Sequence, residues 1–369
     1  MTLWDLWKAV RTVTTLFDRY RLGELDLPNR VVMAPMTRVR AAADGLATPS
    51  MATYYAQRAT AGLIVTEGVQ PSLIGQSNPG TPGLHTDGQV TAWRQVTGAV
   101  HANGGRVFAQ IMHGGRVSHP ETTGLQPVGP SAVPAVGEVF TPTGPKPAPV
   151  PRALPTAEVS EHVHSYADAA RRAVDAGFDG VELHGANGYL IGQFLSTGAN
   201  LRTDRYGGSI GNRIRFAVEA VSATVEAVGG HRTGIRLSPG AGIWGATETD
   251  VPELYGALLA ELAPLGLAYV HLEATTDEEV LLGLRAAWPG TLVVNPAFPM
   301  GPRPTDRAAA DRWLGLGADL ISFGRAFIAN PDLVERLRQG LPIAPDDPAT
   351  WYAGGDAGYL TYPAYRHVA

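Results

Sequence analysis

The sequence predicts an α/β fold, a (β/α)8 TIM barrel, on the strength of two observations. Eight short apolar runs of strand length are spread along the 369 residues, and stretches with the amphipathic period of a helix separate them. Runs this short and apolar are typical of strands that are buried on both faces of a parallel sheet. Eight strand-helix units in one chain close most economically into a single barrel.

The predicted strands are residues 31–36, 63–69, 106–112, 180–184, 234–238, 268–273, 292–295 and 319–324. The predicted helices include residues 89–102, 157–176, 212–228, 250–265, 277–287, 306–316 and 331–338. Gly177, Gly229 and Gly340 stand at three helix ends, where left-handed C-caps are expected. Asn330-Pro331 is typical of an N-cap followed by a first-turn proline.

Three segments lie outside this alternation. Residues 22–27 predict a hairpin with its turn near Gly23-Glu24, which could plug the bottom of the barrel. Residues 1–17 lack the features of a signal peptide or a membrane-spanning helix, so we expect a short amphipathic helix or a mobile extension before a single barrel domain over 18–369. Residues 113–155 are rich in proline and predict a long, irregular, lid-like loop after the third strand.

Charge and cysteine content exclude several classes of function. The net charge of −5 provides no basic surface for nucleic acid or anionic lipid, so neither partner is expected. The chain has no cysteine, which excludes disulfides, iron–sulfur clusters, thiolate zinc sites and cysteine nucleophiles. We expect a cytoplasmic protein, either a monomer or a homodimer.

The most informative segment places His184, Asn187 and Tyr189 within six residues at the carboxyl end of a predicted strand. Two neutral hydrogen-bond donors beside a weak acid suit a substrate carbonyl that gathers negative charge and then needs a proton. Taken alone, the same residues could merely cap a strand-to-helix turn. On a continued helix Tyr189 would lie roughly 140° away from the other two, so the segment is expected to bend.

The carboxyl ends of the other strands converge on the same face of a barrel. They are expected to bring together Pro35, Met36, Thr37, Gly68, Gln110, Met112, Arg236, Gly324 and Arg325. This set contains no paired acids, metal-ligand cluster or serine nucleophile. Its amide, hydroxyl and guanidinium groups suit a flat polar heterocycle that carries a phosphate.

Arg236 needs a negative partner, because an uncompensated guanidinium inside a barrel is costly. An anionic reduced flavin would be one such partner. A carboxylate of a neighbouring strand, Glu182 or Glu273, would be another. Gly324-Arg325 stands where barrels commonly bind phosphate.

Four motifs resemble the Old Yellow Enzyme family of flavin-dependent ene-reductases. They are residues 29–38, 184–189, 200–209 and 322–331, and the likeness runs in order from about residue 16 to 365. The resemblance implies FMN bound noncovalently at the barrel mouth and reduced by NADPH or NADH. It further implies hydride transfer to the β-carbon of a small-molecule activated alkene.

The resemblance also implies residue roles. His184 and Asn187 would bind the activating carbonyl or nitro oxygen, and Tyr189 would protonate the α-carbon. Met112 and Tyr352 would border the substrate pocket, and Thr37 matches the branch with threonine rather than cysteine near the flavin. The matching FMN contacts are Pro35, Met36, Thr37, Gly68, Gln110, Arg236, Ala297, Gly324 and Arg325.

Two departures from the family pattern bear on the site. Met112 replaces a tryptophan of many members, which should widen one pocket wall. Asn295-Pro296-Ala297 replaces a glycine-containing phosphate loop, and Pro296 has no N–H to donate. Two alternatives stay open: an FMN barrel used oxidatively as a dehydrogenase, and a flavin- or ligand-binding barrel without turnover.

Overall fold

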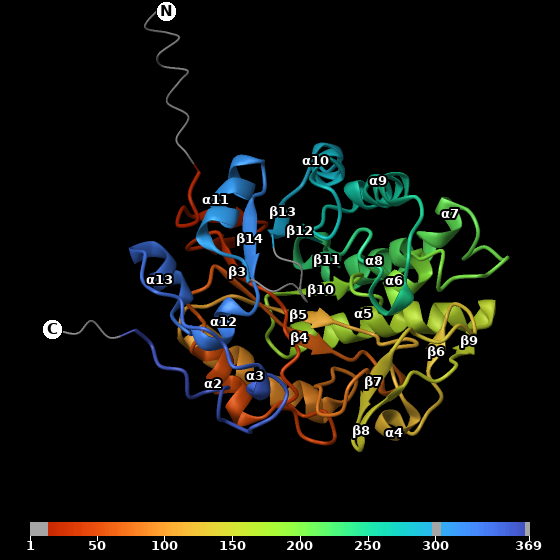
Figure 1. Cartoon of the computed structure of the whole chain (residues 1–369), viewed down its shortest axis with the longest axis horizontal. Coiled ribbons are helices and arrows are strands. Elements are labelled where there is room, and N and C mark those ends of the chain that lie inside the picture. The colour runs from red at the N-terminus through yellow and green to blue at the C-terminus, as the bar shows by residue number, and fades with distance from the viewer. Residues whose placement is uncertain (1–13, 297–303, 366–369) are drawn as a thin grey trace, which may run out of the picture.

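The structure, a computed structural model, describes residues 14–296 and 304–365, and it confirms the barrel. Eight parallel strands close in the order β10-β11-β12-β13-β14-β3-β4-β5 (Figure 1). Their bounds are β3 Val31–Met33, β4 Leu63–Val69, β5 Val107–Ile111, β10 Gly180–His184, β11 Thr233–Leu237, β12 Tyr269–Glu273, β13 Leu292–Asn295 and β14 Leu320–Phe323.

The first barrel strand is shorter than predicted. β3 ends at Met33 rather than at residue 36, although the Ala34 N–H still donates to the Phe323 carbonyl at 2.9 Å. Pro35 carries no N–H and cannot continue a ladder. The three residues after Ala34 are therefore in an irregular segment at the barrel mouth.

All seven predicted helices are present around the barrel. The longer helices are α2 Pro49–Ala56, α3 Asp87–Ala102, α5 Val159–Asp175, α8 Arg215–Val228, α9 Val251–Leu262, α10 Glu278–Ala287, α11 Arg307–Gly315 and α13 Leu333–Gln339. Short helices are α4 Pro120–Thr123, α6 Leu190–Leu195, α7 Ile210–Arg213 and α12 Ala326–Ala329. α2 is not among the predicted helices, although Thr48 caps it and Pro49 opens it.

Two of the predicted helix ends are wrong. Asp332, not Asn330, is the N-cap of α13, because the Asn330 side chain instead donates to the carbonyls of Ala326 and Ala344. Gly229 has a positive φ of 90° but an extended ψ of 146°, so it is not a left-handed cap. Gly340 is one, with φ 68° and ψ 30°.

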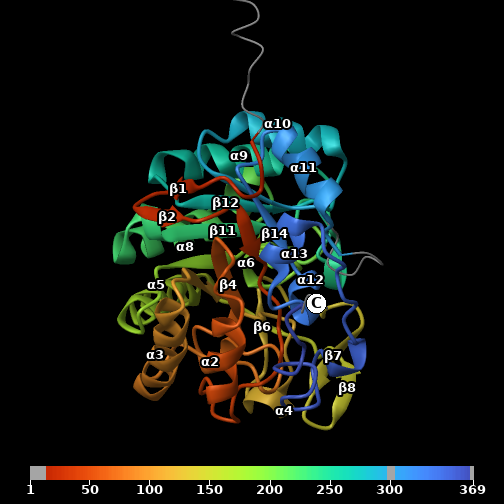
Figure 2. The same ribbon diagram turned by 90° about the vertical axis from the view of Figure 1, so that its left-hand side faces the viewer.

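The predicted hairpin closes the amino-terminal end of the barrel. β1 (Tyr20–Leu22) and β2 (Leu25–Leu27) pair antiparallel around Gly23, whose φ is 55°. Leu22 and Leu27 are buried in one apolar cluster with the inward side chains of Phe108 and Tyr269. In Figure 2 this hairpin lies on the opposite side of the molecule from β7 and β8.

Large and small side chains alternate in this bottom layer of the barrel. The rings of Phe108 and Tyr269 stack with centroids 5.7 Å apart. A methyl group added at Gly234 would lie 2.6 Å from the Tyr269 ring, so only glycine leaves room for it. This dry layer closes the floor beneath the polar residues further up the strands.

Residues 113–155 are more ordered than predicted. β7 (Glu138–Thr141) and β8 (Gly144–Pro147) form an antiparallel hairpin, and β6 (Val128–Gly129) pairs with β9 (Arg152–Ala153). The prolines concealed the exposed-buried alternation of β7, which buries Val139 against Val117 and Ala135. Tyr189 and Trp244 pack on the same cluster, so residues 113–155, here called the lid segment, lie against the loops that follow the carboxyl ends of β10 and β11.

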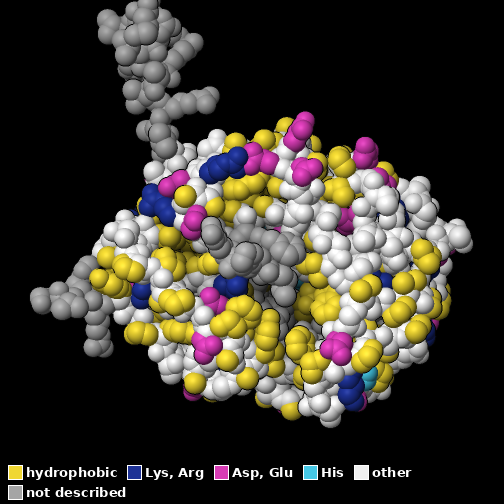
Figure 3. Space-filling view, in the orientation of Figure 1, with side chains coloured by type: hydrophobic (Ala, Val, Ile, Leu, Met, Phe, Trp, Pro, Cys, Tyr) yellow, Lys and Arg dark blue, Asp and Glu magenta, His cyan; other side chains and the backbone are white. Residues whose placement is uncertain are grey.

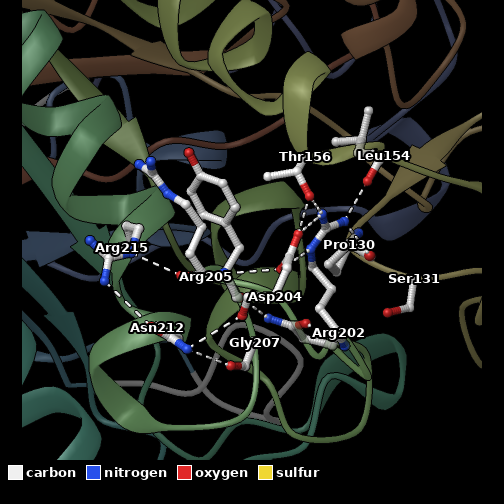
Figure 4. Close-up of polar contacts among 12 residues, drawn as sticks. Pro130, Ser131, Leu154, Thr156, Arg202, Asp204, Arg205, Gly207, Asn212 and Arg215 are labelled. Carbon is white, nitrogen blue, oxygen red and sulfur yellow. Dashed lines mark hydrogen bonds and ion pairs between the residues drawn. The ribbon is translucent and has the colours of Figure 1, made fainter.

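The motif at residues 200–209 binds residues 113–155, the lid segment, at two points, one in its middle and one near its carboxyl end (Figure 4). Arg202 Nη1 donates to the carbonyls of Pro130 at 2.9 Å and Leu154 at 2.5 Å. Asp204 receives the Arg202 Nε–H at 2.9 Å, and this bond holds the pKa of the Asp204 carboxyl well below its usual range. The motif therefore positions the lid segment.

Gly234→Ala should lower the free energy of unfolding by about 1–3 kcal/mol, because the new methyl group overpacks the layer against Tyr269. Gly256→Ala is the matched control: it lies inside α9, and no atom lies within 4 Å of its added methyl group. That substitution should stabilise the protein by about 0.5–1 kcal/mol. Urea denaturation followed by circular dichroism measures both, and equal effects in the two variants would contradict the packing argument.

Arg202→Ala should loosen the lid segment, because two lid carbonyls lose their donor. Trypsin should then cleave after the exposed Arg152 about tenfold faster, which corresponds to ~1.4 kcal/mol of opening free energy. Arg171→Ala, which removes a surface pair with Asp168, is the control. An unchanged cleavage rate in Arg202→Ala would show that the lid segment is held by other contacts.

Candidate active site

The chain bends sharply just after β10. Asn187 and Gly188 have φ values of 57° and 73°, and α6 begins at Leu190. A methyl group at Gly188 would lie 2.5 Å from the Ile243 carbonyl oxygen, so glycine is required there. Asparagine is one of the few other residues that adopt this left-handed conformation readily. The predicted bend is confirmed, and two successive left-handed residues produce it.

This bend brings the His184 and Tyr189 rings together, with centroids 5.1 Å apart. Asn187 does not cap the turn with its side chain. Its backbone N–H donates to Ser238 Oγ at 2.8 Å, and its Nδ2 donates to Glu273 Oε1 at 2.9 Å. The capping alternative is therefore not what the structure shows, because the amide points to another strand.

His184 is buried and neutral. Burial, followed by the positive charge of Arg236, lowers the pKa of His184 to about 3. Its Nδ1 lies 3.4 Å from Gln110 Nε2, which also donates to Glu182 Oε1 at 2.8 Å. Because an amide nitrogen only donates, Nδ1 accepts and the ring proton resides on Nε2. The imidazole thus offers an uncharged donor.

Tyr189 is partly buried beneath the lid segment. Burial raises the pKa of its phenol to about 12, so the hydroxyl keeps its proton at neutral pH. An imidazole donor and a phenolic acid therefore lie side by side in their neutral forms. Figure 3 has the same orientation as Figure 1. Near the centre of the face that it shows, hydrophobic side chains border a hollow.

The sequence left open whether Glu182 or Glu273 pairs with Arg236, and in the structure the partner is Glu273. Arg236 Nη2 lies 2.8 Å from Glu273 Oε1, and both side chains are buried. Glu182 instead pairs with His271, whose Nδ1 is 2.9 Å from Glu182 Oε2. Within the described part of the chain, Arg236 Nε, Glu273 Oε2 and Asn187 Oδ1 are buried without a hydrogen-bond partner.

These unpaired buried atoms fit a polar ligand at the barrel mouth, since native proteins rarely leave such groups unsatisfied. The mouth also has space beside the predicted flavin contacts. A methyl group at Gly324 would come no closer than 3.8 Å, to Met36 Sδ. Pro35, Met36 and Thr37 are partly exposed there. A flat heterocycle such as that of FMN suits this donor set.

Gly68 and Met112 form one tight contact at this mouth. Gly68 follows a register shift in β4, and a methyl group there would lie 2.7 Å from Met112 Sδ. Met112 is buried, and its N–H donates to the Val69 carbonyl at 2.9 Å. The predicted pocket wall at Met112 thus packs directly on a predicted flavin contact.

The predicted phosphate side is described only in part. Arg325 lies over the Trp351 ring, with its guanidinium carbon 5.6 Å from the centroid. Asn295 Nδ2 donates to the carbonyl and the hydroxyl of Ser322, both at 3.0 Å, inside the barrel. Ala297 lies outside the described residues.

Tyr352 lies where the carboxyl-terminal segment meets the lid segment. Its half-exposed ring is 5.9 Å from that of Phe140 in β7. Arg40 donates to the carbonyls of Thr350 at 2.8 Å and Trp351 at 2.6 Å, and Arg38 Nε also donates to Trp351, at 3.0 Å. These two arginines fix the backbone on which Tyr352 stands.

Sequence reasoning missed Phe140 and Trp244 and weighed Glu273 only as a partner for Arg236. Trp244 has a φ of 57°, and its carbonyl accepts from the Val136 N–H at 2.9 Å and from Arg116 Nη2 at 3.0 Å. An aromatic residue in the glycine-rich run after the Arg236 strand was the available signal.

Among the described residues, no cluster of histidines and acids could hold a metal ion, and no helix is long and apolar enough to cross a membrane.

Known proteins share this architecture and much of the sequence. The chain is 38% identical to a probable flavin mononucleotide-dependent alkene reductase of Leishmania infantum, over 96% of this chain and 99% of that protein. It superimposes on an old yellow enzyme homologue from Zymomonas mobilis with a TM-score of 0.91, 39% identity and coverage of 95% and 100%.

Morphinone reductase in complex with tetrahydroNAD gives a TM-score of 0.90 at 43% identity, with 96% of this chain and 98% of that chain covered. The sequence profile of the NADH:flavin oxidoreductase / NADH oxidase family matches residues 15–344, nearly the whole barrel. The chain therefore belongs to the NADH:flavin oxidoreductase / NADH oxidase family, within the Old Yellow Enzyme group.

Proposed function

We propose that the pocket formed by His184, Asn187 and Tyr189 reduces the activated double bond of an α,β-unsaturated carbonyl compound or nitroalkene. The observation that carries this proposal is the pair of neutral rings, with the pKa of His184 lowered to about 3 and that of Tyr189 raised to about 12. Bound FMN would supply the redox chemistry, in which a hydride from NADPH or NADH would pass through the flavin to the β-carbon of the alkene.

His184 and Asn187 bind the oxygen that activates the alkene. His184 offers its Nε2–H, and Asn187 offers the amide hydrogen that Glu273 leaves free. Negative charge grows on the substrate oxygen during reduction, and preplaced donors in a buried site stabilise that charge without reorganising. A neutral imidazole suits this role, because it does not protonate the oxygen prematurely.

Tyr189 supplies the proton to the α-carbon. Its high pKa keeps the phenol protonated, and the cluster of Val117, Ala135 and Val139 beside it limits access of water. General acids of this kind typically contribute about 10²–10⁴-fold in rate. The lid segment thus has a direct role, since it forms the wall behind the acid.

The residues that we propose to bind FMN lie at the mouth of the barrel. Arg236 would offer a donor to the ring. Gln110, whose two amide hydrogens go to Glu182 and His184, would border the ring together with Pro35, Met36, Thr37, Gly68 and Gly324. Arg325 offers charge to the phosphate, and the Ala297 N–H, outside the described residues, stays a predicted contact. Thr37 assigns the chain to the branch with threonine near the flavin, and Met112 and Tyr352 border the substrate.

The remaining expectations accompany this proposal. We infer a cytoplasmic monomer or homodimer with one FMN-binding domain over 18–369, and a surface that binds neither nucleic acid nor membrane. Purified protein should show flavin absorbance that NADPH or NADH bleaches anaerobically and that cyclohexenone restores. A colourless protein, or flavin that neither nicotinamide bleaches, would refute the ene-reductase proposal.

Tyr189→Phe should slow alkene reduction by about 10²–10⁴-fold, because the substitution removes the proton donor and keeps the ring. Stopped-flow measurement of the two half-reactions tests this. Reduction of the flavin by NADPH provides the internal control and should stay close to the wild-type rate. Equal loss in both half-reactions would assign Tyr189 to the flavin site rather than to proton transfer.

The rate constant for alkene reduction should stay nearly constant from about pH 5.5 to pH 10. His184 has a pKa lowered to about 3 and Tyr189 a pKa raised to about 12, so neither residue changes charge in this window. Stopped-flow traces with the flavin reduced in advance measure this directly. An inflection near pH 6.5 that disappears in His184→Asn would contradict the buried, neutral histidine.

A further inference from the structure

Glu273 is a buried acid in the proposed active site. It is neither one of the proposed substrate contacts nor one of the proposed flavin contacts. It ends β12, and its side chain points into the barrel mouth, where it meets Arg236 of β11 and Asn187 of the turn after β10. The side chain is 0% exposed, so the carboxylate has no solvent to stabilise it. Burial of a carboxylate costs free energy of desolvation, so its presence here points to a role for its contacts.

The two oxygens of Glu273 have different surroundings. Oε1 accepts from Asn187 Nδ2 at 2.9 Å and lies 2.8 Å from Arg236 Nη2. Oε2 has no hydrogen-bond partner among the described residues, and the same is true of Arg236 Nε and Asn187 Oδ1. The three unpaired atoms belong to one connected cluster, which indicates that a polar ligand completes it.

Glu273 determines which way the Asn187 amide is turned. A carboxylate accepts hydrogen bonds and donates none, so the amide NH2 group must face it and Oδ1 must point elsewhere. One amide hydrogen is then used by Glu273, and the second is left for a substrate oxygen. With a neutral amide in place of Glu273, Asn187 could turn over and present Oδ1, which would repel that oxygen.

Glu273 also offsets the positive charge of Arg236. A guanidinium attracts a negative ligand less strongly when a carboxylate lies 2.8 Å away in a buried site. Reduction adds negative charge to a flavin, so a compensated Arg236 favours the reduced cofactor less than an uncompensated one. The expected consequence is a lower midpoint potential of the bound cofactor.

We propose that Glu273 is a positioning residue that turns the Asn187 amide toward the substrate oxygen and lowers the midpoint potential of bound FMN by offsetting Arg236. This inference rests on the proposed function, because it assigns Asn187 to the substrate and Arg236 to the flavin. It adds a residue that acts on both through one carboxylate oxygen.

Glu273→Gln tests both effects, because it keeps the size of the side chain and removes its charge. The midpoint potential should become more positive. If the ratio of the dissociation constants of reduced and oxidised FMN changes tenfold, the shift is about 30 mV for a two-electron couple. FMN should bind the apoprotein at least as tightly as in wild type, measured by quenching of flavin fluorescence. KM for cyclohexenone should rise more than kcat falls.

Two further variants frame the comparison. Glu273→Asp keeps the charge, so its potential should stay nearer to that of wild type than the potential of Glu273→Gln does. Glu248→Gln is the control: Glu248 is a partly buried acid that accepts from the Gly240 N–H and the Tyr255 hydroxyl, both at 2.8 Å. It should leave both the potential and KM at their wild-type values.

The outcomes distinguish a failure of the proposed function from a failure of the role assigned to Glu273. If wild type binds no FMN or reduces no alkene, the proposed function itself fails. If wild type is active and Glu273→Gln has an unchanged potential and an unchanged KM, the inference about Glu273 is overturned and the function stands. Loss of FMN from Glu273→Gln would also overturn it, because removal of the carboxylate is predicted to favour the cofactor.

Discussion

The site depends on the buried contact between Arg236 and Glu273. Both side chains are nearly inaccessible, and a charge in such a position is tolerated only beside an opposite charge with good geometry. Removal of one partner from a pair of this kind typically costs about 3–5 kcal/mol, because the other charge is left uncompensated. Asn187 donates to the same carboxylate, so the proposed substrate donor and the proposed flavin contact are both held by Glu273.

This arrangement follows from strand geometry, because every second side chain of a barrel strand points into the barrel. Along β12, Tyr269, His271 and Glu273 point inward in turn, from the apolar floor through a middle layer to the mouth. The middle layer is a continuous polar chain, in which His271 bonds to Glu182 at 2.9 Å and to Ser322 at 2.8 Å. These bonds satisfy polar groups that burial would otherwise leave unpaired. The same dry surroundings keep His184 uncharged.

Irregular segments complete the pocket, and arginines hold them in place. Arg202 binds the backbone carbonyls of Pro130 and Leu154 in the lid segment, and Arg40 binds carbonyls of the carboxyl-terminal segment. A guanidinium carries five donors in one plane, so it can tie together several carbonyls that no helix or strand satisfies. The rings of Phe140 and Tyr352 meet between these segments, and Arg40 holds the backbone just before Tyr352.

The sequence alone was enough to predict the barrel and to propose His184, Asn187 and Tyr189 as the reactive residues, because both rest on local properties. Short apolar runs and amphipathic stretches report burial within a few residues, and His184, Asn187 and Tyr189 stand close together in the chain. The helix α2 and the β7–β8 hairpin were missed, since neither stands out from the irregular composition around it. Only the tertiary structure decided that Arg236 pairs with Glu273 rather than with Glu182, and that Asn187 turns toward that same acid. Those choices depend on which inward side chains share a height in the closed barrel, a relation that arises only when strands distant in sequence lie next to one another.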